Sequence, residues 1–125
     1  MDEKIRGALK LDMVVDITTT GRSSGEPRRI EIWSHYLDGQ VIVTGSPGHR
    51  SWYANMVANP RITYHLKDEV KADLPATVQP ITDDVERRAI FTRLKEVSRF
   101  RQGQPMTDPE EWVKGSRLVE VTFDG

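Results

Sequence analysis

Two short segments of the sequence concentrate groups that can bind an anion. The first, GRSSGEPRR over residues 21–29, combines two glycines and two serines with three arginines. The second, TGSPGHR over residues 44–50, contains glycines, a serine and Arg50, and directly precedes a predicted helix. Backbone amides, hydroxyls and guanidinium groups are the donors that phosphates and carboxylates require, and a helix N-terminus adds partial positive charge. If both segments lie at one rim of the fold, they form an anion site.

Ordinary turns are the alternative explanation for both segments. Glycine is common in turns because it adopts positive φ, and exposed arginine and serine keep loops soluble. The composition alone leaves an anion site and a pair of plain turns about equally open. The choice depends on whether folding brings the two segments together.

Motifs of several other chemistries are absent from the sequence. Residues 21–27 lack the spacing and the lysine of a P-loop, no G-x-G-x-x-G follows a predicted strand, and there is no G-x-S-x-G elbow. His35, His49 and His65 lie on separate segments without H-x-x-x-H spacing, so we expect no metal site. Two pairs of neighbouring acidic residues open predicted helices, where carboxylates stabilise the helix dipole without any catalytic role.

Four aromatic residues gather between the second predicted strand and the first predicted helix, namely Trp33, Tyr36, Trp52 and Tyr53. Packing in the core is the more frequent fate of such side chains. Beside an anion-binding rim they also suit a pocket, because a planar heterocycle with a phosphorylated tail needs both features.

The first half of the chain reads as a series of strands. Residues 13–20 are rich in β-branched side chains and stop at a glycine, which predicts a strand. Residues 28–37 alternate in character and predict a second strand. Asp38 and Gly39 form a strong hairpin signal, and residues 40–46 return as its antiparallel partner.

Helices and strands alternate in the second half. Residues 51–59 predict a helix of about two turns that ends at Pro60. Residues 61–67 and 70–79 predict an antiparallel pair, in which Pro75 indicates an edge strand or a bulge.

The most regular pattern of the chain spans residues 82–100 and predicts an amphipathic helix with Thr82 or Asp83 as its cap. A short helix over 108–113 and a closing strand over 116–123 follow. The buried face of the long helix is expected to carry Val85, Ala89, Ile90, Leu94 and Val97.

Together these elements predict a mainly β fold with flanking helices (α+β), a small antiparallel barrel formed by a single domain over residues 1–125. The net charge of -1 does not favour nucleic acid or an anionic membrane. The chain has no cysteine, no signal-peptide pattern and no apolar run of membrane length, so we expect a cytoplasmic protein.

The order of these motifs resembles one known family. TTTGRSSGEPR, a strand, the turn at Asp38 and Gly39, VIVTGS and then WYANMVANPRITYHLK are similar to the deazaflavin-dependent nitroreductases and quinone reductases. The similarity runs from about Val15 to Glu86 and resumes at the closing strand. It implies a split β-barrel, like that of flavin reductases and pyridoxamine-phosphate oxidases.

The resemblance also implies binding of coenzyme F420, an 8-hydroxy-5-deazaflavin with a phosphorylated lactyl-oligoglutamate tail. Family enzymes pass hydride from the reduced coenzyme to a quinone, enone or nitroaromatic compound. Trp33 and Ser46 are candidates for positioning the ring or the acceptor, and no side chain is assigned as a certain catalyst. The residues expected to bind the coenzyme are Arg22, Ser23, Ser24, Arg28, Thr44, Gly45, Ser46, Pro47, Arg50, Trp52 and Asn55.

The sequence departs from the family pattern in places. Ser23 and Pro47 stand where basic residues are common, so tail affinity could be weaker unless Arg22, Arg29 and Arg50 compensate. Two alternatives stay open: an FMN-binding split-barrel oxidoreductase, and a non-catalytic deazaflavin carrier. Because split-barrel relatives often dimerise, a homodimer is also among the expected assemblies.

Overall fold

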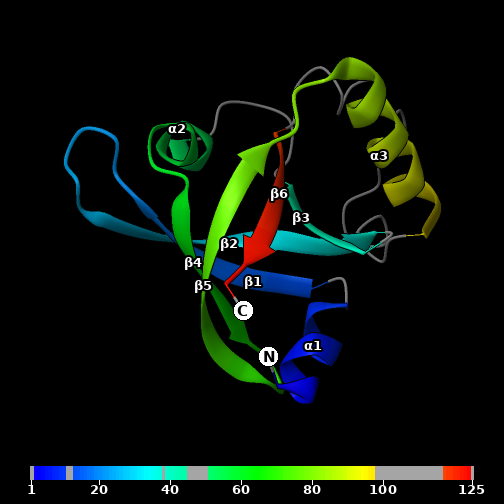
Figure 1. Ribbon diagram of the computed structural model, residues 1–125, viewed down its shortest axis with the longest axis horizontal. Coiled ribbons are helices and arrows are strands. Elements are labelled where there is room, and N and C mark those ends of the chain that lie inside the picture. The colour runs from blue at the N-terminus through cyan, green and yellow to red at the C-terminus, as the bar shows by residue number, and fades with distance from the viewer. Residues whose placement is uncertain (1, 11–12, 38, 45–50, 98–116, 125) are drawn as a thin grey trace.

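The structure is a computed structural model and describes residues 2–10, 13–37, 39–44, 51–97 and 117–124. Within these ranges, six antiparallel strands form a closed barrel in the order β1-β2-β3-β6-β5-β4 (Figure 1), which confirms the predicted antiparallel barrel. The strands are β1 (Met13–Thr20), β2 (Pro27–Leu37), β3 (Gln40–Thr44), β4 (Arg61–Lys67), β5 (Lys71–Pro80) and β6 (Leu118–Phe123).

The sequence of strand β1 alternates between buried and less buried side chains, as expected for a strand of a barrel. Its β-branched side chains alternate, so that Val15 and Ile17 lie in the main core, each 0% exposed, and Thr19 lies on the same face of the strand with 1% exposure. The β2–β3 turn contains Gly39 at a φ of 87°, as the Asp-Gly signal predicted. The two predicted hairpin strands pair in antiparallel fashion from Trp33 to Leu37.

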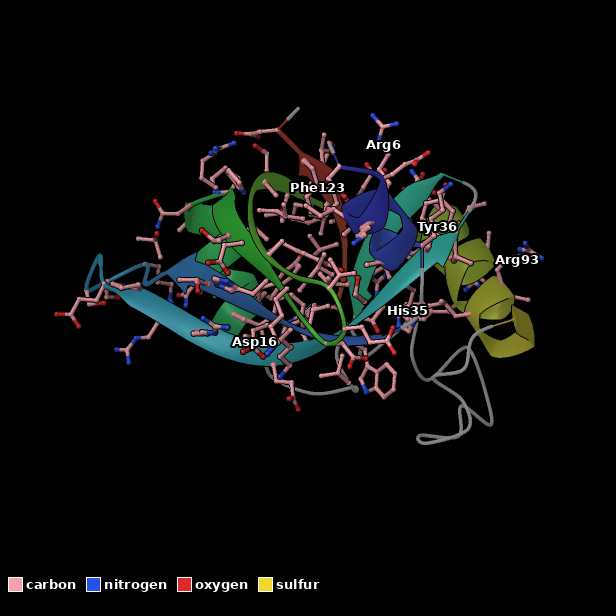
Figure 2. All side chains as sticks on the ribbon, turned by 90° about the horizontal axis from the view of Figure 1, so that it is seen from below. Arg6, Asp16, His35, Tyr36, Arg93 and Phe123 are labelled. Carbon is pink, nitrogen blue, oxygen red and sulfur yellow. The ribbon has the colours of Figure 1, made fainter. Side chains whose placement is uncertain are left out.

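The β1–β2 hairpin extends beyond the part of the sheet that closes the barrel. β1 pairs with β2 from Met13 to Thr20, but with β4 only from Asp16 to Thr18. The end of the hairpin therefore projects from the barrel, and its tip and helix α3 lie at opposite ends of the molecule (Figure 1, Figure 2). We call residues 19–28 the hairpin arm.

Three helices in the described ranges cover the barrel: α1 (Glu3–Leu9), α2 (Ser51–Ala58) and α3 (Asp84–Val97). α1 and α2 add apolar residues to the main core, and α2 lies beside the hairpin arm (Figure 1). α3 packs on the outer face of β2, β3 and β6 through a second, smaller core. None of these helices is long and apolar enough to cross a membrane, as far as the described residues extend.

Three sequence expectations need correction. Helix α1 was not predicted, although Asp2 caps it through the Lys4 amide. On α3, capped by Asp83 as predicted, Val85 (74% exposed) and Ala89 are exposed, contrary to the prediction. Leu94 is buried as predicted, and Phe91, which was not assigned to the buried face, is buried as well. The edge-strand prediction for β5 holds only for its first half, because β6 pairs with it from Ala76 onward. The predicted helix over 108–113 lies outside the described residues.

One polar pair lies inside the barrel. The hydroxyls of Ser34 and Tyr64 are 2.6 Å apart, and the two residues are 0% and 1% exposed. Burial of the phenol raises the pKa of Tyr64 to about 12, because the charged form would lose its hydration, while the bond to Ser34 opposes this rise. The pair therefore satisfies two hydroxyls that would otherwise lack partners in an apolar core.

We expect Tyr64→Phe to destabilise the protein by about 1–3 kcal/mol, because it leaves the Ser34 hydroxyl buried without a partner. The double variant Ser34→Ala/Tyr64→Phe should lose less stability than the sum of the single variants. Denaturant unfolding measures both, with Tyr36→Phe at a half-buried position as the control. Wild-type stability in Tyr64→Phe would show that the bond contributes nothing.

Candidate cofactor-binding site

A cavity of about 400 Å³ lies between the hairpin arm and helix α2. The turn of the arm, the adjoining strand ends and one face of α2 form its walls. No carboxylate is among the described residues that line it. These are Thr19, Gly21, Arg22, Ser23, Ser24, Arg28, Ile30, Trp52 and Asn55.

The turn at the tip of the arm is held by its own backbone. The Gly21 amide donates to the Glu26 carbonyl at 2.8 Å, and the Gly25 amide donates to the Gly21 carbonyl at 2.9 Å. Gly25 has a φ of 70°, which side chains with a Cβ rarely adopt. Ser24 Oγ accepts from the Glu26 amide at 3.1 Å, which leaves its hydroxyl hydrogen to donate to a ligand.

Two guanidinium groups at the cavity have no neutralising partner among the described residues. Arg22 and Arg28 are exposed, and neither side chain has a hydrogen-bond or ion-pair partner among the described residues. Arg28 pairs with Thr19 in the hairpin, so both lie on the inner face of the arm. With the serine hydroxyls, these cations make a lining of donors that matches an anion.

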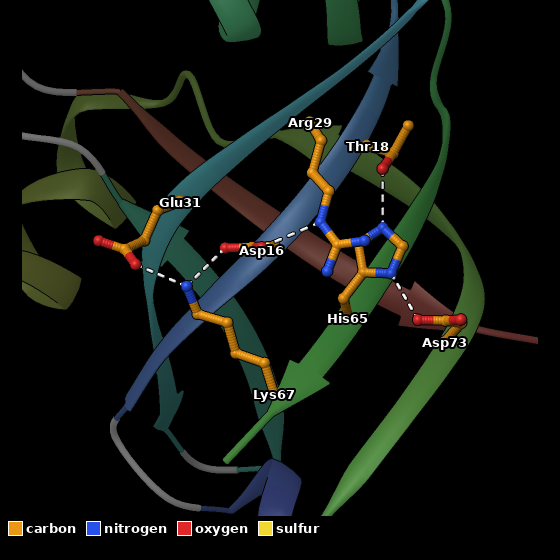
Figure 3. A network of polar contacts seen from close by, with 7 residues as sticks. All are labelled: Asp16, Thr18, Arg29, Glu31, His65, Lys67 and Asp73. Atoms are coloured by element: carbon orange, nitrogen blue, oxygen red, sulfur yellow. Dashed lines mark hydrogen bonds and ion pairs between the residues drawn. The ribbon is translucent and has the colours of Figure 1, made fainter.

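On the outer face of the same strands, charged side chains form ion pairs with one another (Figure 3). Asp16 accepts from Arg29 Nε at 2.9 Å and from Lys67 Nζ at 2.7 Å, and Lys67 also bonds Glu31 at 2.5 Å. The Lys67 and Arg29 bonds hold the pKa of Asp16 below its usual range, against the effect of burial. Arg29 is therefore paired on the outer face and does not line the cavity, contrary to its expected role in compensating for Ser23.

A hydroxyl–imidazole–carboxylate chain also lies on this outer face. His65 Nε2 is 2.7 Å from Thr18 Oγ1, and His65 Nδ1 is 2.6 Å from Asp73 Oδ1. The bond from His65 lowers the pKa of Asp73. Thr18 sits mid-sheet with a neighbour on each side, so its backbone is engaged in the sheet and offers no oxyanion-binding amide. We interpret the chain as structural.

Helix α2 supplies the remaining wall of the cavity. Trp52 is 7% exposed and packs edge-on against Tyr53, with ring centroids 6.0 Å apart. Asn55 accepts a hydrogen bond from the Arg22 amide at 3.2 Å and donates one to Thr19 Oγ1 at 3.3 Å. The helix thus places an aromatic surface beside the donors of the arm.

Two other predicted residues, Thr44 and Trp33, are not among the residues that line this cavity. Thr44 is 1% exposed, and its hydroxyl is 3.1 Å from His35 Nε2. Trp33 is half-buried, stacks on His35 with centroids 6.4 Å apart, and packs against the core under α3. Gly45, Ser46, Pro47 and Arg50 lie outside the described residues.

Sequence analysis missed three lining residues, Thr19, Gly21 and Ile30. Strand alternation could have indicated Ile30, because it is two residues from Arg28 on the same face. Thr19 could have been found once the hairpin register was known, since it is the cross-strand partner of Arg28. The six predicted residues that do line the cavity are Arg22, Ser23, Ser24, Arg28, Trp52 and Asn55.

Comparison with known families agrees with this architecture. A family model described as F420H(2)-dependent quinone reductase matches residues 3–110. An F420 reductase structure is 18% identical, with a TM-score of 0.73 over 100% of this chain and 97% of that one. A structure of an F420-H2 dependent reductase is 25% identical, with a TM-score of 0.61 over 87% and 93%.

The fold is shared more widely than these reductases. A putative pyridoxamine 5'-phosphate oxidase from Listeria innocua is 9% identical, with a TM-score of 0.70 over 98% of this chain and 93% of that one. At this identity the likeness concerns the fold alone. The predicted split barrel of the flavin-reductase and pyridoxamine-phosphate-oxidase kind is confirmed.

The outer-face ion pairs predict a dependence of stability on pH. Because the folded-state pKa of Asp16 lies below its ordinary value of 3.8, its contribution is complete above that pH and is lost as the pH falls through the lowered pKa. We expect Asp16→Asn to be less stable than wild type at about pH 6, with the difference narrowing at about pH 3.

Thermal unfolding at both pH values measures this effect. Asp68→Asn, at an exposed carboxylate in the β4–β5 turn, serves as the control and should follow the wild-type profile. If the difference in stability between Asp16→Asn and wild type were the same at both pH values, protonation of Asp16 would not contribute to the loss of stability in acid.

Proposed function

The chain belongs to the F420H(2)-dependent quinone reductase family, a family of oxidoreductases, and on this basis we propose that it transfers hydride from reduced coenzyme F420 to a small organic acceptor. The observation that carries the proposal beyond family membership is the cavity beside α2, whose described lining contains two arginines and no carboxylate. A quinone is the preferred acceptor class because the family model carries that description. Enones and nitroaromatic compounds are further candidates.

The cavity fits the tail of this coenzyme. The tail is polyanionic, and the cavity offers Arg22, Arg28 and two serine hydroxyls without a competing carboxylate among its described lining residues. Hydrogen bonds to charged groups contribute about 1.5–3 kcal/mol each. Two such bonds would account for a substantial part of micromolar affinity, which corresponds to about 8 kcal/mol.

Apolar groups beside the donors suit the part of the ligand that joins tail to ring. Trp52 and Ile30 line the same cavity as Arg28. From the resemblance we further propose that Thr44, Gly45, Ser46 and Pro47 lie near the ring and that Arg50 assists with the tail. The hydrogen bond between His35 and the Thr44 hydroxyl would then fix the start of this segment.

No side-chain nucleophile is needed if the coenzyme supplies the chemistry and the protein supplies the binding. The bound deazaflavin supplies the hydride, and the chain's own residues bind, orient and shield it. Arg22 and Arg28 neutralise the tail, and Trp52 limits movement of the neighbouring ligand atoms. Their catalytic contribution is orientation, which reduces the entropy lost when the two reactants meet.

Titration of the purified protein with reduced coenzyme F420 tests the proposal, and saturable binding at micromolar concentration is the expected result. A protein that binds FMN instead, and is yellow as purified, would support the flavin alternative. A protein that binds the deazaflavin but reduces no quinone, enone or nitroaromatic compound would be a carrier. Failure to bind at all rejects the proposed function.

We expect Arg28→Ala to weaken coenzyme binding by about 10–100-fold, because it removes one unpaired cation from the donor lining. Thermal stability should stay nearly unchanged, since the guanidinium has no partner among the described residues to lose. Arg29→Ala is the matched control, because it removes a guanidinium group from the next residue of the strand, which lies on the outer face.

The Arg29→Ala variant should bind the coenzyme within about threefold of wild type. Equal affinity in the two variants would place the tail somewhere other than the inner face of the arm. A weaker Arg29→Ala with normal Arg28→Ala would place it on the outer face.

We expect Trp33→Ala to reduce acceptor turnover more than tail binding, because Trp33 is proposed to position the ring or the acceptor. Steady-state kinetics with a quinone, combined with the coenzyme titration, separate kcat from affinity. Loss of stability with unchanged kinetics per folded molecule would instead assign Trp33 to the core under α3.

A further inference from the structure

Asn55 lies where helix α2 meets the hairpin arm. Its side chain is 7% exposed, and both ends of its amide are used by the protein. Oδ1 accepts from the backbone amide of Arg22 at 3.2 Å, and Nδ2 donates to Thr19 Oγ1 at 3.3 Å. One side chain therefore ties the helix both to the turn of the arm and to strand β1.

Thr19 carries this connection to the second strand of the arm. Its hydroxyl oxygen is 3.5 Å from the Arg28 carbonyl oxygen, and the residue is 1% exposed. A hydroxyl has only one hydrogen, so Thr19 directs it to Arg28 and accepts from Asn55. The chain of contacts thus reaches the backbone of both residues that present unpaired guanidinium groups at the cavity.

We infer that Asn55 is a positioning residue, which fixes the backbones of Arg22 and Arg28 at the spacing that the anionic group requires. The identity of that group rests on the proposed function, whereas the tie between helix and arm rests on the bonds alone. The resemblance implied that Asn55 binds the coenzyme directly. The geometry points to an indirect effect, through the arm, as its main contribution.

The physical reason is that the arm has few other supports: outside its own strands and turn, the described residues add a bond of 3.5 Å from Asn59 Nδ2 to the Thr20 carbonyl. Beyond Thr18, β1 has no pairing with β4, and an isolated two-stranded ribbon is marginal in water. Without the tie, the two cations would have to be ordered when the ligand binds, and this entropy would be subtracted from the affinity. Asn55 removes that cost beforehand.

Amide hydrogen exchange without ligand provides the first test. In Asn55→Ala the Arg22 amide loses its acceptor, so its exchange should accelerate at least about tenfold. Val57→Ala, at a 59% exposed position of the same helix, is the matched control and should leave this exchange unchanged. Unchanged exchange in Asn55→Ala would overturn the inference, whatever ligand the protein binds.

Coenzyme affinity provides the second test, through a double-mutant cycle with Thr19→Val. This near-isosteric change breaks the bond from the Thr19 side. A positioning role predicts that either single variant weakens binding by roughly tenfold and that the double variant is little worse. Near-wild-type binding in Thr19→Val, with additive effects in the double variant, would show direct contact and overturn the inference.

The two tests separate the inference from the proposed function. If wild-type protein binds no deazaflavin, the proposed function fails, and the exchange experiment alone decides whether Asn55 holds the arm. If the coenzyme binds and exchange at Arg22 is unaffected by Asn55→Ala, the function stands and the positioning role fails.

Discussion

Incomplete strand pairing along the β1–β2 hairpin is the constraint from which the site follows. β1 meets β4 over only three residues, from Asp16 to Thr18, and β2 meets β3 only from Trp33 onward. The hairpin arm therefore stands outside the closed barrel as a two-stranded ribbon. Helix α2 supports one face of this ribbon, and the cavity is the space that remains between them.

Strand alternation then gives the two faces of the hairpin different electrostatics. On the outer face, the cations Arg29 and Lys67 form ion pairs with Asp16, and Lys67 forms a second ion pair with Glu31. On the inner face, Arg28 has no such partner among the described residues. Like charges that lie close together repel one another, so a lining of this kind suits the anionic ligand proposed above. The neighbouring residues Arg28 and Arg29 thus lie on opposite faces of the hairpin, and only Arg29 has an ion-pair partner among the described residues.

Local patterns predicted most of the fold, whereas the support of the site depends on distant contacts. The six strands were found because β-branched runs and turn residues act locally. α1 was overlooked because its charged residues obscure Ile5, Ala8 and Leu9, whose spacing is helical. The bond between Asn55 and the Arg22 amide joins residues 33 positions apart, and no local pattern reports it. The site's donors were therefore predictable, but their support was not.

Shifted pKa values usually point to catalytic groups, but in this protein they mark the structural networks instead. Asp16 and Asp73 are shifted by the ion pairs of the outer face, and Tyr64 is shifted by burial in the barrel. The described residues that line the cavity include no carboxylate, histidine, lysine or tyrosine. Such a lining suits the proposed hydride transfer from a bound coenzyme, in which the chain's own residues would match charge and fix orientation. The unpaired donors of the arm, and not a perturbed acid, are therefore the physical signature of this site.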